Sequence, residues 1–189
     1  MRLARLVPAQ LDADQATLYD DIVHGPRSKG VQHFALTADD GSLNGPFNAF
    51  LLAPGIARSL QSLGTAVRYE TALTAREREL AILIIAAHWG STFEQQSHEA
   101  VGRAAGLTES ELATVSAGGV PTLSDPREQA IANTVFALAN GDLDDEQWAV
   151  DLERSTIFEL TTLVGYYSTL ALQLRVFRVD TAEAHNGAL

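Results

Sequence analysis

Apolar side chains recur at helical spacing along most of the chain, and no window shows convincing strand alternation bounded by hairpin turns. The most apolar stretch covers residues 75–88, where nearly every position after Arg78 is apolar. This pattern is typical of a helix that is buried on most sides. An amphipathic stripe over residues 54–69 predicts a core-facing helix before it, and a second, more polar helix is predicted after it, over residues 91–105. The pattern therefore predicts an all-α protein organised around one buried helix.

Capping residues and helix breakers set the predicted boundaries. Ser/Thr-x-x-Glu capping boxes begin at Thr74, Ser91 and Thr108, and glycine or proline marks several other ends. Helices are predicted at about 10–24, 46–53, 54–69, 75–88, 91–105, 109–117, 126–140, 144–148 and 155–177. The remainder is predicted to be an irregular arm at 1–9, a long loop at 25–46 and a frayed tail at 180–189. We expect a single domain over 1–189, with its core at about 43–177.

Composition and charge narrow the possible functions. The chain has 189 residues and no cysteine, which excludes thiol redox chemistry, thiolate metal sites and disulfides. Its formal net charge of −11 disfavours binding to nucleic acid and to anionic membranes. No apolar run is long enough for a secretory signal or a membrane span. We therefore expect a cytoplasmic protein that acts on a small molecule.

Candidate chemistry lies on the predicted helix at 91–105. Ser91, Glu94 and His98 stand at i, i+3 and i+7, so their side chains share one face. Imidazole titrates near neutral pH, and Glu94 can accept one of its N–H groups while the other nitrogen is left to act. Ser91 is expected to cap the helix and to donate a hydrogen bond to a ligand. Two alternatives stay open at this point: Glu94 and His98 as a solvated ion pair, and Ser91 with Glu94 as a helix cap alone.

Glu79 stands at the start of the apolar run on the predicted core helix. A carboxylate in such a place must be paired or protonated, so we expect a raised pKa and a proton relay to His98. The alternative is an ion pair with Arg76 or Arg78 at a solvent-facing helix start.

Three further residues are candidates for binding a substrate. Trp89 and Phe93 border the predicted break between the two helices and can wall a flat pocket or fill the core. His33, in the long loop, can point into a pocket or be solvated. A metal site is not expected because the Glu94 and His98 pair lacks a third ligand, and no glycine-rich phosphate loop supports a nucleotide cofactor.

Glu79, Ser91, Glu94 and His98 occupy the spacing Glu-x11-Cys-x2-Cys-x3-His, with both cysteine positions replaced. In this the chain resembles the carboxymuconolactone decarboxylase family of the alkylhydroperoxidase D-like superfamily. Further stretches resemble the cysteine-less branch of that family: residues 43–48 (LNGPFN), Trp89-Gly90, Phe93-Glu94, residues 105–108 (AGLT) and residues 165–167 (GYY). The resemblance covers roughly residues 43–177.

The resemblance implies a compact multi-helix fold, a homo-oligomer such as a trimer or hexamer, and two more substrate-binding residues, Asn48 and Tyr167. It also implies decarboxylation of a small unsaturated or lactone carboxylic acid in aromatic-compound catabolism, without metal or organic cofactor. His98 would be the acid, oriented by Glu94 or Glu79. The thiol peroxidase activity of the superfamily is not expected, because Ser91 and Glu94 replace its cysteines. A non-catalytic oligomeric ligand-binding or scaffold protein is the alternative.

Overall fold

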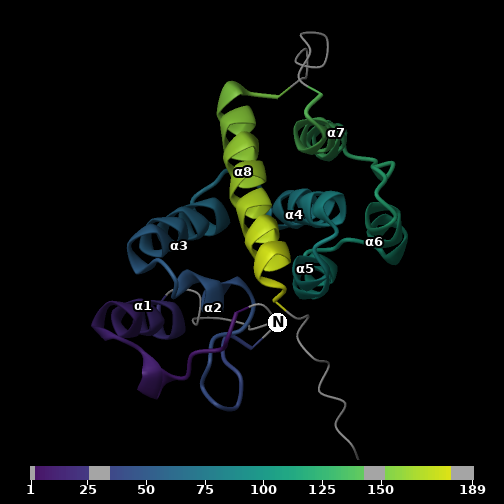
Figure 1. The fold of residues 1–189 in the computed structure, drawn as a ribbon. Helices are drawn as coiled ribbons and strands as arrows, with labels where there is room; N and C mark the ends of the chain where they lie inside the picture. Colours follow the sequence, from purple (N-terminus) through teal and green to yellow (C-terminus); the bar gives the residue numbers. More distant parts are fainter. Residues whose placement is uncertain (1–2, 26–34, 143–151, 180–189) are drawn as a thin grey trace, which may run out of the picture. The chain divides into compact units, whose positions relative to one another are not determined.

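The computed structural model describes residues 3–25, 35–142 and 152–179, and within them every regular element is a helix (Figure 1). After a short 3-10 turn at Pro8–Gln10 the helices are α1 (Ala13–His24), α2 (Pro46–Phe50), α3 (Pro54–Tyr69), α4 (Ala75–Trp89), α5 (Thr92–Ala104), α6 (Glu109–Ser116), α7 (Pro126–Asn140) and α8 (Arg154–Phe177). The all-α prediction is confirmed. The predicted helix at 144–148, the tail at 180–189 and His33 lie outside the described residues. None of the described helices is long and apolar enough to cross a membrane.

The chain divides into two compact units. One consists of Met1–Thr65 together with Leu172–Leu189, and the other of Ala66–Ala171. Both boundaries fall inside helices, α3 and α8. The candidate residues on α4, α5 and the first part of α8 all belong to the second unit.

In the first unit, polar side chains hold the N-terminal arm in place. Arg5 donates to Asn44 Oδ1 at 3.0 Å, and the side-chain amide of Asn48 accepts from the Leu6 N–H and donates to the Ala4 carbonyl. Helix α1 begins at the capping box of Asp12 and Gln15 and buries Leu18 and Ile22. The arm is therefore bound through backbone groups that would otherwise need water.

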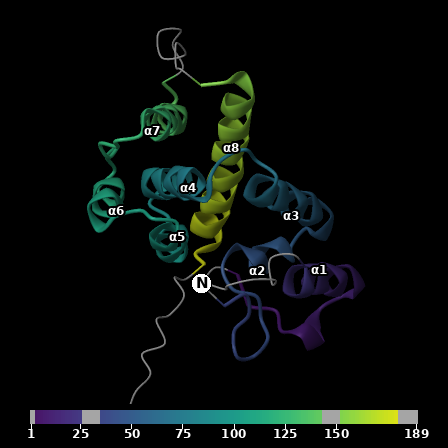
Figure 2. The same cartoon turned by 180° about the vertical axis from the view of Figure 1, so that it is seen from behind.

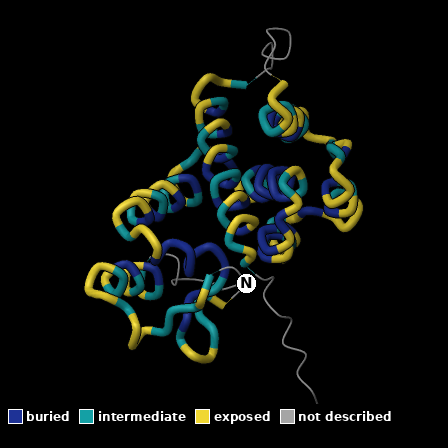
Figure 3. Tube along the Cα trace, in the orientation of Figure 1, coloured by how far each residue is buried: buried dark blue, intermediate teal, exposed yellow. Residues whose placement is uncertain are grey.

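In the second unit, α4 forms the centre. Every residue from Leu80 to Ala86 is buried, and the helix is dark blue along its middle in Figure 3. Helices α5, α6 and α7 pack on it, as Figures 1 and 2 show from opposite sides. The predicted capping box of Thr74 and Glu77 is present at its start. A helix with apolar side chains on all sides is thus surrounded by neighbours, as its sequence predicts.

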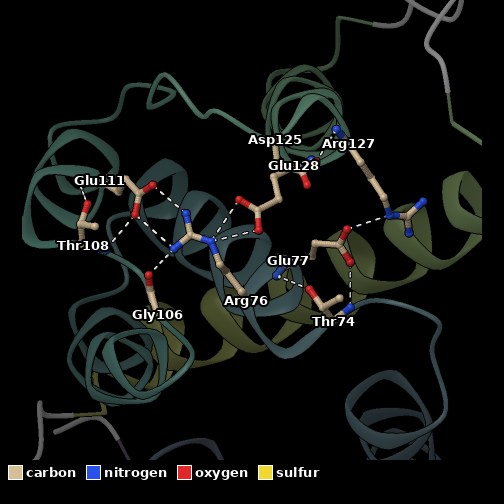
Figure 4. Close-up of polar contacts among 9 residues, drawn as sticks. All are labelled: Thr74, Arg76, Glu77, Gly106, Thr108, Glu111, Asp125, Arg127 and Glu128. Atoms are coloured by element: carbon tan, nitrogen blue, oxygen red, sulfur yellow. Dashed lines mark hydrogen bonds and ion pairs between the residues drawn. The ribbon is translucent and has the colours of Figure 1, made fainter.

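Arg76, in the first turn of α4, ties this helix to three other segments (Figure 4). Its guanidinium contacts Glu111 of α6 at 2.6 Å, Glu128 of α7 at 3.0 Å and the Gly106 carbonyl. One residue further along, Glu77 accepts from Arg127 of α7 at 2.7 Å. We call Arg76, Glu111 and Glu128 the Arg76 cluster; it fixes α6 and α7 against the start of α4.

The break between α4 and α5 depends on Gly90. This residue has φ of 61° and ψ of 35°, a left-handed conformation that glycine adopts without steric cost. The N–H groups of Gly90 and Ser91 donate to carbonyls in the last turn of α4. The chain can therefore turn sharply, and α5 packs back along α4.

Candidate functional site

His98 of α5 lies buried between two carboxylates. Its Nδ1 is 2.6 Å from Glu79 Oε2 on α4, and its Nε2 is 3.4 Å from Glu94 Oε2, one turn earlier on α5. Glu79, Glu94 and His98 are 1%, 4% and 4% exposed. The three side chains form a carboxylate–imidazole–carboxylate chain, here called the Glu79–His98–Glu94 chain, that is withdrawn from water.

The two carboxylates keep the His98 ring protonated. Burial disfavours the charged ring, but the charge and hydrogen bond of Glu79 and the interactions with Glu94 outweigh it, and the pKa of His98 rises to about 9. Burial likewise disfavours ionised Glu79, but the His98 charge and hydrogen bond, with Arg68 and Arg78, lower the pKa of Glu79 below its ordinary value. At neutral pH the Glu79–His98–Glu94 chain therefore contains a protonated His98 next to an ionised Glu79.

Two details differ from the expectations drawn from the sequence. The second ring nitrogen of His98 is not left free, because Glu79 occupies it. The pKa of Glu79 is lowered rather than raised, because a buried cation that lies 19 positions away in the sequence compensates for the loss of hydration. Of the two arginines considered for Glu79, Arg78 approaches it at 3.8 Å, whereas Arg76 is bound elsewhere.

Ser91 precedes α5, but the predicted capping box is wrong. Its side chain makes no cap hydrogen bond, and its Oγ is buried without a partner. Glu94, the other half of the predicted box, contacts His98 instead. The hydroxyl of Ser91 is therefore available for a molecule from outside the chain.

Tyr167 of α8 lies against the Glu79–His98–Glu94 chain. Its ring meets the His98 ring edge to face, with centroids 5.4 Å apart and planes at 87°. Burial, and then the charges of Glu94 and Glu79, raise the pKa of its phenol well above the usual 10. The phenol is therefore a neutral hydroxyl throughout the physiological range.

The other predicted binding residues lie in different surroundings. Trp89 is half-buried, and its indole N–H donates to Ser168 Oγ of α8 at 2.9 Å. Phe93 is buried and thus contributes to the core. Asn48 belongs to the first unit, where its amide binds the arm, and His33 is not described. Substrate binding by these four residues stays a prediction.

Arg68 is a contributor that sequence reasoning did not single out. Its charge lowers the pKa of Glu79 and opposes the rise in that of Tyr167. In the sequence it is one of several arginines that a surface position explains equally well, and no local spacing connects it to His98. Only the tertiary arrangement reveals that its charge acts on this site.

The arrangement can store and deliver a proton. An imidazolium between two carboxylates can pass its Nε2 proton to Glu94 while Glu79 holds the ring and stabilises the remaining charge. Among the described residues, no three His, Cys, Asp or Glu side chains are arranged to hold a metal ion. The residues themselves supply acid/base chemistry.

Comparisons with known proteins agree with this description. Residues 54–141 match the model of the carboxymuconolactone decarboxylase family. No curated protein is similar enough to the chain to be matched. Among solved structures, an uncharacterised peroxidase-related protein with an alkylhydroperoxidase AhpD core, from Ralstonia eutropha JMP134, aligns with a TM-score of 0.73 at 12% identity, covering 96% of this chain and 92% of that one.

A second structure is a protein of unknown function from Agrobacterium tumefaciens, considered a candidate AhpD antioxidant defence protein. It aligns with a TM-score of 0.62 at 21% identity, covering 71% of this chain and 95% of that one. At such identities the two structures establish the fold and not the activity. Residues 54–141, which include Glu79, Ser91, Glu94 and His98, are thus similar to the carboxymuconolactone decarboxylase family, and the chain has the AhpD-like fold.

Proposed function

We propose that the protein is a cofactor-independent acid/base enzyme that decarboxylates a small unsaturated or lactone carboxylic acid. The observation that carries the proposal is the burial of His98 between Glu79 and Glu94. The match of residues 54–141 to the model of the carboxymuconolactone decarboxylase family supports this chemistry. The aromatic-compound pathway, a homotrimer or hexamer, and a cytoplasmic location belong to the same proposal.

The cost of burying these groups favours a catalytic role over that of a scaffold. Removing carboxylates and an imidazolium from water costs several kcal/mol per ion, and well-packed apolar residues of similar volume are often as stable or more stable. A pure scaffold gains nothing from that arrangement. A site that must hold a proton away from solvent until it is needed does gain from it.

The proposed reaction uses the Glu79–His98–Glu94 chain as its proton source. The bond between the carboxylate and the substrate carbon breaks, CO2 leaves, and the electron pair moves into a conjugated enolate. Glu94 accepts the Nε2 proton of His98 and gives it to that carbon, which completes the product. His98 then regains a proton from solvent, so that one proton is consumed for each CO2 released. Glu79 positions the ring and keeps its pKa high.

The test is CO2 release from a panel of unsaturated lactone and β-keto carboxylic acids, with the intact chain and with His98→Gln and Glu94→Gln. For the substrate that turns over, each variant should lose about 100-fold or more of kcat, the usual contribution of a positioned acid or base. His88→Gln is the matched control, because His88 is exposed at the end of α4 and is not part of the Glu79–His98–Glu94 chain. Circular dichroism checks that each variant is folded.

Equal turnover in folded His98→Gln and in the unchanged protein would refute the acid/base assignment. No CO2 release from any compound would favour the ligand-binding or scaffold alternative. Because Glu94→Gln keeps the shape of the side chain, it gives an answer even if His98→Gln fails to fold.

A further inference from the structure

Two hydroxyl groups beside the Glu79–His98–Glu94 chain make no hydrogen bond within the described part of the protein. Ser91 is 8% exposed, and its Oγ is enclosed without a partner. Tyr167 is 5% exposed, and its phenol neither donates to nor accepts from any described residue. Buried polar groups in proteins are almost always hydrogen-bonded. The two hydroxyls are therefore suited to a partner that the chain does not supply.

Both hydroxyl-bearing residues are related to Glu94, Ser91 by its position at the start of α5 and Tyr167 by the charge that acts on it. Ser91 is the N-cap residue of α5, three positions before Glu94 in the first turn of that helix. Tyr167 lies on α8 with its ring against that of His98. Among the surrounding charges, that of Glu94 has the largest effect on the pKa of its phenol. The hydroxyl at the start of α5 and the hydroxyl on α8 are thus the two candidates to contact a molecule that receives a proton from Glu94.

The surrounding charges determine what kind of atom these hydroxyls bind. The charged or titratable groups that act on the Tyr167 phenol are Glu94 of α5, Glu79 of α4, Arg68 of α3 and Tyr166 of α8. Two carboxylates oppose ionisation of the phenol, so it is a hydrogen-bond donor. They also repel a fully charged anion. The oxygen that fits is uncharged in the bound substrate and gains negative charge only as the reaction proceeds.

We propose that the hydroxyls of Ser91 and Tyr167 form a donor pair for the carbonyl oxygen of the substrate. This inference rests on the proposed function and narrows it: the substrate is a β-keto or vinylogous acid, in which the carbonyl oxygen gains charge as CO2 departs. Donors placed on that oxygen lower the barrier because they bind the transition state more strongly than the substrate. The leaving carboxylate itself is not bound by this pair.

The test uses cyclopent-2-enone labelled with ¹³C at the carbonyl, an unsaturated cyclic ketone with no carboxylate to lose. Isotope-edited infrared spectroscopy measures the carbonyl stretch of the bound probe, and an NMR titration measures its affinity for the full chain. Ser91→Ala and Tyr167→Phe should each raise the stretching frequency and weaken binding about tenfold, because each removes one donor. Tyr69→Phe and Ser62→Ala are matched controls, because both residues are exposed and lie outside the site.

A higher frequency in both variants and in neither control supports the donor pair. Unchanged frequencies, a change in one variant alone, or a probe that does not bind would overturn it. The infrared measurement needs no turnover, so it tests the donor pair even if the protein is not a decarboxylase. If both variants raise the frequency and neither control does, but no acid releases CO2, the donor pair is retained and the proposed reaction is rejected. A merely structural role of Tyr167 would not move the probe frequency, since Tyr167→Phe keeps the ring.

Discussion

At the scale of single residues, the protonated His98 makes stability depend on pH. Its pKa is about 9 in the folded protein against an ordinary value of 6.5, so the folded state holds this proton more tightly than the unfolded chain does. The stabilisation is fully present below pH 6.5 and is lost as the pH rises through 9. Over this window the free energy of unfolding should fall by up to about 1.4 kcal/mol per pH unit.

Urea unfolding between pH 6.5 and pH 9 measures this dependence. His98→Gln should flatten the alkaline decline, because glutamine has no proton to lose. His88→Gln, which changes an exposed histidine on α4, should retain it. An alkaline decline that is as steep in His98→Gln as in the unchanged protein would contradict the proton assignment.

Ser91 and Glu94 illustrate why part of the site could not be predicted. The Ser-x-x-Glu pattern favours a capping box, yet Glu94 lies against His98 and the Ser91 hydroxyl bonds to nothing in the described chain. The same pattern at Thr74 and Thr108 forms the expected boxes, because Glu77 and Glu111 can each accept from the capping N–H and bind an arginine at the same time. The local pattern therefore predicts a cap only where the tertiary partner leaves the carboxylate within reach of the N-cap N–H.

At the scale of helices, the Arg76 cluster holds α6 and α7 against α4. Arg76→Met should destabilise the protein by about 1 to 3 kcal/mol, because it leaves the carboxylates of Glu111 and Glu128 unpaired where water reaches them poorly. Arg103→Met is the matched control: Arg103 also contacts two glutamates, but on an exposed surface. Its removal should change stability little, and equal losses in both variants would contradict the structural role of the cluster.

Helix boundaries were predicted well from the sequence because capping is a short-range effect. Helix α3 was predicted at its observed bounds, and α4 was predicted to within a residue, since proline, threonine and glycine mark their ends. The three-residue difference at the start of α1 reflects Asp12, a cap that binds Gln15 and that the apolar pattern alone does not reveal. The sequence predicted a proton relay between Glu79 and His98 but not the geometry of their contact. That geometry is set by the packing of α5 on α4.

At the scale of the whole molecule, the absence of cysteine separates this protein from thiol chemistry. Two solved structures with the same fold are described as peroxidase-related or as AhpD-like, and a thiol peroxidase reacts through a thiolate. The chain has none, and Ser91 and Glu94 occupy the two cysteine positions of the family spacing. We therefore predict no protein-dependent peroxide consumption with a dithiol reductant. A rate proportional to protein concentration would contradict this prediction.

The sharp turn at Gly90 has an evolutionary consequence. Glu79, Ser91, Glu94 and His98 all lie within twenty consecutive residues. The turn at Gly90 allows this, because it folds α5 back on α4. The proposed proton-transfer residues are therefore encoded in one short piece of gene, whereas Tyr167 comes from a distant helix. If the proposed roles hold, substitutions in α8 can change the contact with the substrate without changing the segment that supplies the proton.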